Sequence, residues 1–131
     1  MASPRSLQQR TVLVVEDDFY LAEDARDALE DAGAQVLGPV PQISQALGLF
    51  EATQPDCAVL DVSVQDGPSF DLARTILSRA VPVLFVTGYD AGSIPADLAR
   101  VPRLQKPVTQ GGLVAAVEGL LQSAPPGARP D

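Results

Sequence analysis

The chain has 131 residues, about the length of one domain. Its 17 acidic and 9 basic residues give a net charge of -8, and it contains no histidine, one cysteine and one lysine, Lys106. The lack of histidine excludes Ser/His/Asp and Cys/His nucleophiles and histidine-containing zinc sites, and a single cysteine excludes an internal disulfide. Because scattered arginines on an acidic chain suit a phosphate backbone poorly, we expect no direct nucleic-acid binding.

The ends of the chain are predicted to be flexible. Residues 1–10 lack the apolar stretch of a signal peptide, and residues 123–131 are rich in Pro and Gly. The apolar runs between them are strand-sized and fall short of the ~18 residues of a membrane span. We therefore expect one domain over residues 11–122, in a cytoplasmic protein that does not bind membranes.

The hydrophobic pattern alternates between strand and helix periods along the chain. In order it predicts a buried strand at 12–15, a helix from Asp18 to just before Gly33, a strand at 35–37, a helix at 43–50, a strand at 57–60, a helix at 70–77, a strand at 81–86, at best a short helix at 96–100, a strand at 101–105 and a helix at 109–121. Five strand–helix units with doubly buried strands predict a parallel sheet with helices on both faces. A barrel would need eight units, so we predict an open, doubly wound α/β fold.

Polar residues follow four of the predicted strands. Parallel sheets of this kind bind ligands beyond the carboxyl ends of their strands, where this chain places Glu16-Asp17-Asp18, Asp61, Thr87 and Lys106. Taken singly, Asp18 is typical of a helix cap, Thr87 of a loop and Lys106 of a solvated surface. Together they suggest crowded carboxylates that a hard cation such as Mg²⁺ would relieve, beside a hydroxyl and an ammonium. That set suits phosphoryl transfer to an aspartate.

Four segments resemble the signature segments of the receiver domain of two-component response regulators. They are VLVVEDD (12–18), AVLDV (58–62), PVLFVTGY (82–89) and LQKP (104–107). The resemblance covers roughly residues 10–122 and implies a flavodoxin-like (βα)5 fold, with a five-stranded parallel sheet in the order 2-1-3-4-5.

The same resemblance implies a phosphoacceptor and a metal site. Asp61 would accept a phosphoryl group from a phosphohistidine on a sensor histidine kinase or a histidine phosphotransfer protein. Mg²⁺ would be bound by Asp61, by Asp17 directly, by Glu16 through water and by the backbone carbonyl of Ser63. Because the chain has no histidine, the donor must lie on another molecule or another domain.

The resemblance also assigns roles around the phosphoryl group. Thr87 and Lys106 would each bind a phosphoryl oxygen, and the Lys106–Pro107 peptide would be cis. Receivers usually carry an aromatic residue three positions before the lysine, where this chain has Arg103. The segment FVTGY (85–89) instead resembles the receiver subgroup nicknamed FAT GUY, often single-domain proteins, in which Tyr89 would switch together with Thr87. An ordinary loop tyrosine is the alternative for Tyr89.

Such a domain would catalyse only its own phosphorylation and dephosphorylation, and would switch the binding of a downstream protein partner. Two other functions stay open. One is a receiver-like docking module that takes no phosphate. The other is a small Mg²⁺-dependent phosphohydrolase of the haloacid-dehalogenase type, which needs an acid two residues after its nucleophile, where this chain has Ser63. The sequence does not decide whether the chain is complete or belongs to a hybrid kinase.

Overall fold

The computed structural model describes residues 6–88 and 94–122. Its centre is a five-stranded sheet in which every neighbouring pair is parallel, in the order β2–β1–β3–β6–β7. The strands are β1 (Thr11–Val15), β2 (Gln35–Val40), β3 (Cys57–Asp61), β6 (Val83–Thr87) and β7 (Arg103–Gln105). Counted within this sheet, the order is the predicted 2-1-3-4-5, so the flavodoxin-like doubly wound fold is confirmed.

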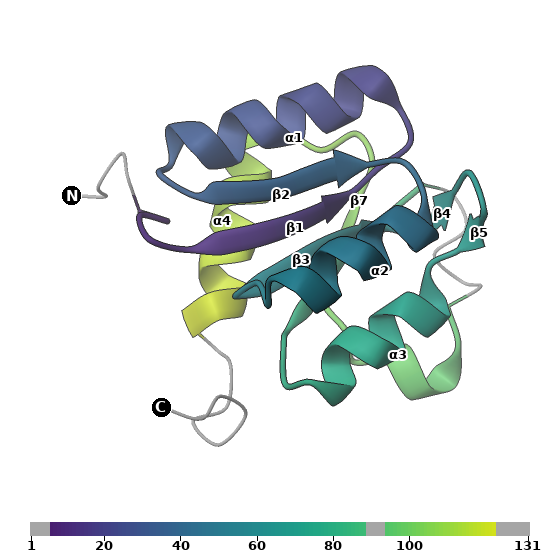
Figure 1. Cartoon of the computed structure of the whole chain (residues 1–131). Helices are drawn as coiled ribbons and strands as arrows, with labels where there is room; N and C mark the ends of the chain where they lie inside the picture. Colours follow the sequence, from purple (N-terminus) through teal and green to yellow (C-terminus); the bar gives the residue numbers. More distant parts are fainter. Residues whose placement is uncertain (1–5, 89–93, 123–131) are drawn as a thin grey trace.

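Helices cover both faces of the sheet (Figure 1). One face is covered by α1 (Phe19–Asp31) and α4 (Gln110–Gln122), and the other by α2 (Ile43–Ala52) and α3 (Phe70–Ser78). The fourth connection contains only a 3-10 turn, η2 (Ala96–Leu98), within its described part. Within the described ranges, no helix has the length and apolar character needed to cross a membrane.

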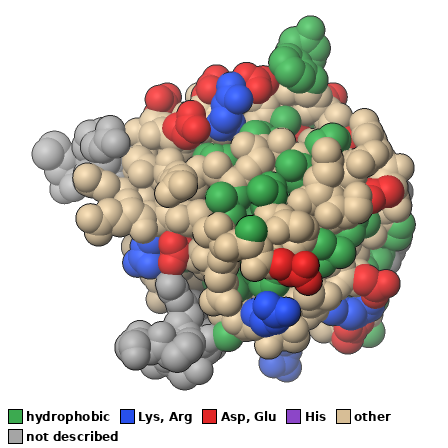
Figure 2. Space-filling view, viewed as in Figure 1, with side chains coloured by type: hydrophobic (Ala, Val, Ile, Leu, Met, Phe, Trp, Pro, Cys, Tyr) green, Lys and Arg blue, Asp and Glu red, His purple; other side chains and the backbone are tan. Residues whose placement is uncertain are grey.

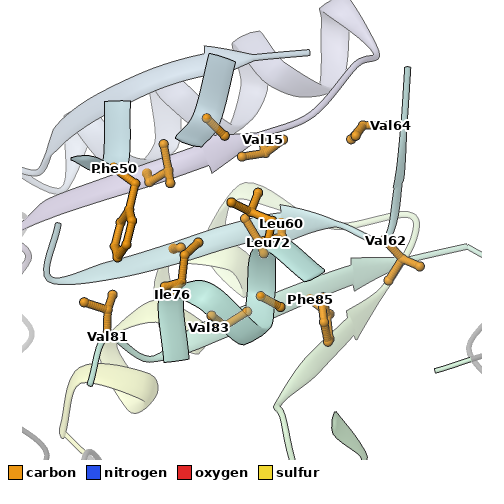
Figure 3. Packing of buried hydrophobic residues seen from close by; sticks show 14 of the residues in the cluster. Val15, Phe50, Leu60, Val62, Val64, Leu72, Ile76, Val81, Val83 and Phe85 are labelled. Carbon is orange, nitrogen blue, oxygen red and sulfur yellow. The ribbon is translucent and has the colours of Figure 1, made fainter. Parts of the chain in front are cut away.

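Two hydrophobic layers hold the helices on the sheet. Every residue of β3 and β6 is buried, as expected for central parallel strands. On the face of α2 and α3, Phe50 and Ile76 pack against strand residues (Figure 3), and the Phe70 and Phe85 rings meet edge to face with centroids 6.1 Å apart. Full burial of one such side chain contributes about 1.5–3 kcal/mol. Leu72, which the sequence pattern did not single out, belongs to this layer.

The beginning of the chain differs from its prediction as a flexible tail. Residues 6–9 form a turn, and Leu7 is only 1% exposed, in the layer beneath α1 and α4. The Leu7 backbone N–H donates to the Ala32 carbonyl at 2.8 Å. Residues 6–10 are therefore part of the domain. The predicted tail at 123–131 lies outside the described residues.

Two prolines were predicted inside strands and lie just before them. Pro82 precedes β6 and Pro102 precedes β7, and the carbonyl of each accepts a hydrogen bond from the neighbouring strand, from Ala58 and Phe85 respectively. Proline has no N–H to donate to a ladder, so its place is at the margin of the sheet.

A small hairpin that the sequence pattern did not reveal follows β3. Its strands are β4 (Ser63–Val64) and β5 (Gly67–Pro68), which pair antiparallel. Gly67 has a φ of 123°, a conformation that residues with a Cβ rarely adopt. Two-residue strands bury too little surface to produce a detectable period, so the segment had the pattern of a loop.

Candidate functional site

The carboxyl ends of the strands meet at one edge of the sheet, on the side of the β4–β5 hairpin in Figure 1. Glu16 follows β1, Asp61 ends β3, Thr87 ends β6 and Lys106 follows β7. Glu16, Asp61 and Thr87 are buried, with 8%, 6% and 1% of their surface exposed. The predicted clustering of these side chains is therefore present in the structure.

Asp61 and Lys106 form the centre of the site. The Lys106 Nζ lies 3.0 Å from Asp61 Oδ2 and 3.5 Å from Glu16 Oε1. The second Asp61 oxygen, Oδ1, accepts a hydrogen bond from the Ser63 N–H at 3.3 Å. The only lysine of the chain thus bridges two buried carboxylates, one at the end of β3 and one directly after β1.

The close packing of these charges shifts their proton affinities. Burial, the hydrogen bond shared with Asp61 and the charge of Asp61 raise the pKa of Glu16 to about 7, although the Asp18 N–H and Lys106 partly oppose the rise. Burial alone would lower the pKa of Lys106, but its hydrogen bond to Asp61 and the two carboxylate charges raise it above its ordinary value. The site therefore carries excess negative charge that a further cation would offset.

Three carboxylates, one of them that of Asp61, converge at the site. Glu16, Asp17 and Asp61 each offer an oxygen, and the three atoms lie within 4.8 Å of one another. Glu16 is already engaged, since its Oε2 accepts the Asp18 N–H at 3.1 Å, whereas Asp17 is exposed. An all-oxygen donor set with one exposed and two buried carboxylates fits a hard divalent cation such as Mg²⁺. Asp18 caps α1, as expected, by accepting the Leu21 N–H at 3.0 Å.

An open pocket lies over Asp61. Its lining residues are Asp17, Asp18, Asp61, Val62, Ser63, Thr87, Gly88 and Lys106. The Thr87 hydroxyl donates to the Gly88 carbonyl at 3.3 Å, which is long for a hydrogen bond between oxygens. The hydroxyl is therefore weakly held. The Thr87 carbonyl accepts the Lys106 N–H at 2.8 Å, which ties the ends of β6 and β7 together. The Lys106–Pro107 peptide is cis, as the resemblance implied.

Ser69 supports the site and was missed by sequence reasoning. It precedes α3, is fully buried, and its Oγ donates to the Asp61 carbonyl at 2.8 Å instead of capping its own helix. A serine before a helix has the pattern of an ordinary N-cap, so the sequence gives no signal for this longer contact.

Arg103 and Tyr89 stand at the two positions where this chain was expected to differ from, or replace, the usual aromatic switch. Arg103, at the position usually aromatic in receivers, donates from its guanidinium to the Ala99 carbonyl at 2.9 Å and does not line the pocket. Tyr89 lies outside the described residues.

Known proteins give a consistent picture. The family model for the response regulator receiver domain matches residues 12–118. The chain is 32% identical over 118 residues to the sensory transduction protein BceR of Bacillus subtilis, covering 85% of this chain and 49% of BceR. It is 26% identical over 113 residues to the transcriptional regulatory protein PdtaR of Mycobacterium tuberculosis, covering 83% of this chain and 55% of PdtaR. The chain thus spans about half the length of these curated relatives.

Solved structures agree with the family model. The solution structure of SdrG from Sphingomonas melonis Fr1 superposes with a TM-score of 0.75 at 33% identity, covering 86% of this chain and 96% of SdrG. Fold, site geometry and sequence match all lead to one conclusion: this chain belongs to the response regulator receiver-domain family.

Proposed function

We propose that this receiver domain accepts a phosphoryl group from a phosphohistidine onto Asp61, with the help of Mg²⁺, and thereby changes its binding to a downstream protein partner. The observation that carries the proposal is the pairing of the buried Asp61 carboxylate with Lys106 at 3.0 Å, at the base of an open pocket lined by further carboxylates. A carboxylate held in this way is reachable from outside, yet has a cation beside it to balance the incoming charge.

Asp17, Asp61, Glu16 and the backbone carbonyl of Ser63 are proposed to hold the Mg²⁺. Support comes from the three convergent carboxylates and from the place of Ser63 in the pocket wall. Because both oxygens of Glu16 already have partners, we propose that Glu16 acts through water and that the exposed Asp17 binds directly. Bound Mg²⁺ would offset charge on the oxygens of the phosphoryl group during its transfer.

The residues of the chain position the reaction. An Asp61 oxygen attacks the phosphorus in line, the P–N bond to the donor imidazole breaks, and the imidazole leaves with that electron pair. Lys106 and the Ser63 N–H hold the two carboxylate oxygens of Asp61 in place. Asp61 therefore loses little conformational entropy when it reacts. After transfer, Lys106 pairs with one phosphoryl oxygen. The weakly held Thr87 hydroxyl leaves the Gly88 carbonyl and donates a hydrogen bond to a second phosphoryl oxygen.

The donor protein is proposed to dock on α1. Figure 2 shows a hydrophobic projection at the top of the molecule, over the beginning of α1, and the exposed large hydrophobic residues of the described part are Phe19 and Tyr20, at 69% and 77%. They follow directly on the acidic residues at the pocket, and Asp24 and Asp27 are exposed farther along the helix. Such a surface suits a donor with apolar and basic contacts. Charge reversal at Asp24 and Asp27 should slow transfer.

We also propose that the domain catalyses only its own phosphorylation and dephosphorylation. A phosphohydrolase of the haloacid-dehalogenase type uses an acid two residues after its nucleophile, and the residue there is Ser63. No nucleic-acid contact is proposed for this acidic domain. A cytoplasmic location is proposed, because the domain and its phosphohistidine donor must share one compartment.

Intact mass measurement tests the proposal. The protein is incubated with Mg²⁺ and acetyl phosphate, and a stable gain of one phosphate is expected, absent in Asp61→Asn. Rapid multiple turnover without accumulation would favour the phosphohydrolase. No labelling at all would favour a docking module, and labelling of Asp61→Asn at the normal rate would refute the choice of acceptor.

A further inference from the structure

Asp66 connects the loop after Asp61 to the beginning of α2. It lies at the turn of the β4–β5 hairpin, where its Oδ1 accepts the Ile43 N–H at 2.7 Å and its Oδ2 the Ser44 N–H at 3.3 Å. These two N–H groups belong to the first turn of α2, beside which the hairpin lies in Figure 1. Among the described residues, the helix's own N-cap residue, Gln42, makes no capping bond with its side chain. Asp66 therefore caps α2 from more than twenty positions along the chain.

Other contacts reinforce the link between hairpin and helix. The Gln65 N–H donates to the Pro41 carbonyl at 3.3 Å, and the Gln42 side-chain amide donates to Gln65 Oε1 at 3.3 Å. The Ile43 N–H, followed by that of Ser44, holds the pKa of Asp66 below its ordinary value, so the carboxylate is ionised at neutral pH and its bonds are charge-assisted.

The hairpin is attached to the site at both of its ends. The Ser63 N–H, at the start of β4, donates to Asp61 Oδ1 at 3.3 Å. Ser69, just after β5, donates to the Asp61 carbonyl at 2.8 Å, and its own N–H donates to the Val62 carbonyl at 2.8 Å. Between these ends, Gln65 and Asp66 contact the beginning of α2, and Val64 is buried in the layer beneath α2 and α3.

We propose that Asp66 is a positioning residue that couples the Asp61 site to the first turn of α2. By anchoring the hairpin, it holds Ser63 where the backbone carbonyl of that residue contributes to the cation site. The inference rests on the proposed function, because it concerns the proposed Mg²⁺ site. Coupling between two sites is reciprocal, so occupation of the cation site must in turn stabilise the first turn of α2.

A residue that merely caps α2 would behave differently. Its removal would fray the helix and lower stability without changing the affinity for Mg²⁺. The capping role and the coupling role of Asp66 can be tested separately, because another residue can be made to cap α2. Gln42→Asp, at the N-cap position of α2, restores a capping carboxylate but not the tie to the hairpin.

The experiment measures Mg²⁺ affinity by calorimetry on the full chain. In Asp66→Ala we expect binding about fivefold weaker than in wild type, the lower end of usual coupling between sites. Asp66→Asn keeps one acceptor oxygen and should lie between the two. Asp97→Ala is the matched control, since Asp97 is also exposed, hydrogen-bonded and lowered in pKa, but its partner is Arg74. Its Mg²⁺ affinity should equal that of wild type.

A second measurement uses amide hydrogen exchange. Adding Mg²⁺ should slow exchange at the Ile43 and Ser44 amides in wild type and in Asp97→Ala, and should leave it unchanged in Asp66→Ala. The double variant Asp66→Ala with Gln42→Asp should regain thermal stability while its Mg²⁺ affinity stays weak.

Defined outcomes overturn the inference. Wild-type Mg²⁺ affinity in Asp66→Ala, or recovery of that affinity in the double variant, would show that Asp66 is only a cap. If Asp66→Ala fails to fold, Asp66→Asn and the double variant supply the same comparison. Failure of wild type to bind Mg²⁺ or to gain phosphate would refute the proposed function instead, so the two failures are distinguishable.

Discussion

Replacing Glu16 by glutamine tests the electrostatics of the site when no metal is present. Glu16 is 8% exposed, lies 3.5 Å from Lys106 through Oε1 and accepts the Asp18 N–H through Oε2. Glutamine has nearly the same shape and keeps an acceptor for Asp18, but it removes one of the crowded negative charges. We therefore expect Glu16→Gln to stabilise the metal-free protein at neutral and higher pH.

The magnitude follows from the raised pKa of Glu16. A change from the ordinary 4.5 to about 7 corresponds to about 3–4 kcal/mol, at ~1.4 kcal/mol per pH unit. Below pH 4.5 the carboxyl is protonated in both the folded and unfolded chains, and its full contribution to stability is present. As the pH rises from 4.5 to 7 the unfolded chain ionises first, so this contribution is lost, and above 7 the loss is complete. Because the pocket is open to water, we expect about 1–3 kcal/mol of this difference.

Urea unfolding followed by circular dichroism measures the effect, in EDTA and at several pH values from 5 to 8. The unfolding free energy of Glu16→Gln should be close to that of wild type at pH 5 and should exceed it by about 1–3 kcal/mol at pH 8. Glu30→Gln, on the exposed face of α1, is the control and should show a constant difference. If the difference in unfolding free energy between Glu16→Gln and wild type is also the same at every pH, the reasoning is refuted. Adding Mg²⁺ at pH 8 should reduce that difference.

Three further predictions concern other parts of the domain. Thr87→Ala should still gain one phosphate from acetyl phosphate, but NMR shifts beyond the pocket on phosphorylation should disappear; unchanged shifts would contradict a switching role. Leu7→Ala should lower the unfolding free energy by about 2–4 kcal/mol in urea titration, because Leu7 is 1% exposed; a negligible loss would place residues 6–10 outside the core. The double variant Phe19→Ala and Tyr20→Ala should slow transfer from a phosphohistidine protein about tenfold. Its labelling by acetyl phosphate should stay normal, and equal slowing with both donors would argue against docking.

Much of the fold could be predicted because local pattern and tertiary environment agree. The central strands β3 and β6 are buried throughout, and continuous apolar runs in the sequence reflect this directly. Leu7 could not be placed in the core, since a lone leucine among polar residues carries no period. The cis peptide at Gly38–Pro39 was not foreseen either.

The site divides in the same way. Asp61, Thr87 and Lys106 could be located because each ends a strand or directly follows one, and the carboxyl ends of parallel strands lie at one edge of the sheet. The contacts of Ser69 and Asp66 depend on how the loop after Asp61 folds back, and no short-range pattern encodes them. Periodicity thus predicts residues at the strand ends or directly after them, and gives no signal for residues farther along the loops.

The pairing of Lys106 with Asp61 has a practical consequence for anyone handling this protein. Because Lys106 is the only lysine, reagents that acylate amines can modify only this side chain and the amino terminus. Coupling the protein to a sensor surface or dye through amines therefore risks blocking the pocket over Asp61, whereas attachment through a tag avoids Lys106. Conversely, the rate at which Lys106 is acylated, read by mass spectrometry, measures how tightly Asp61 holds this side chain.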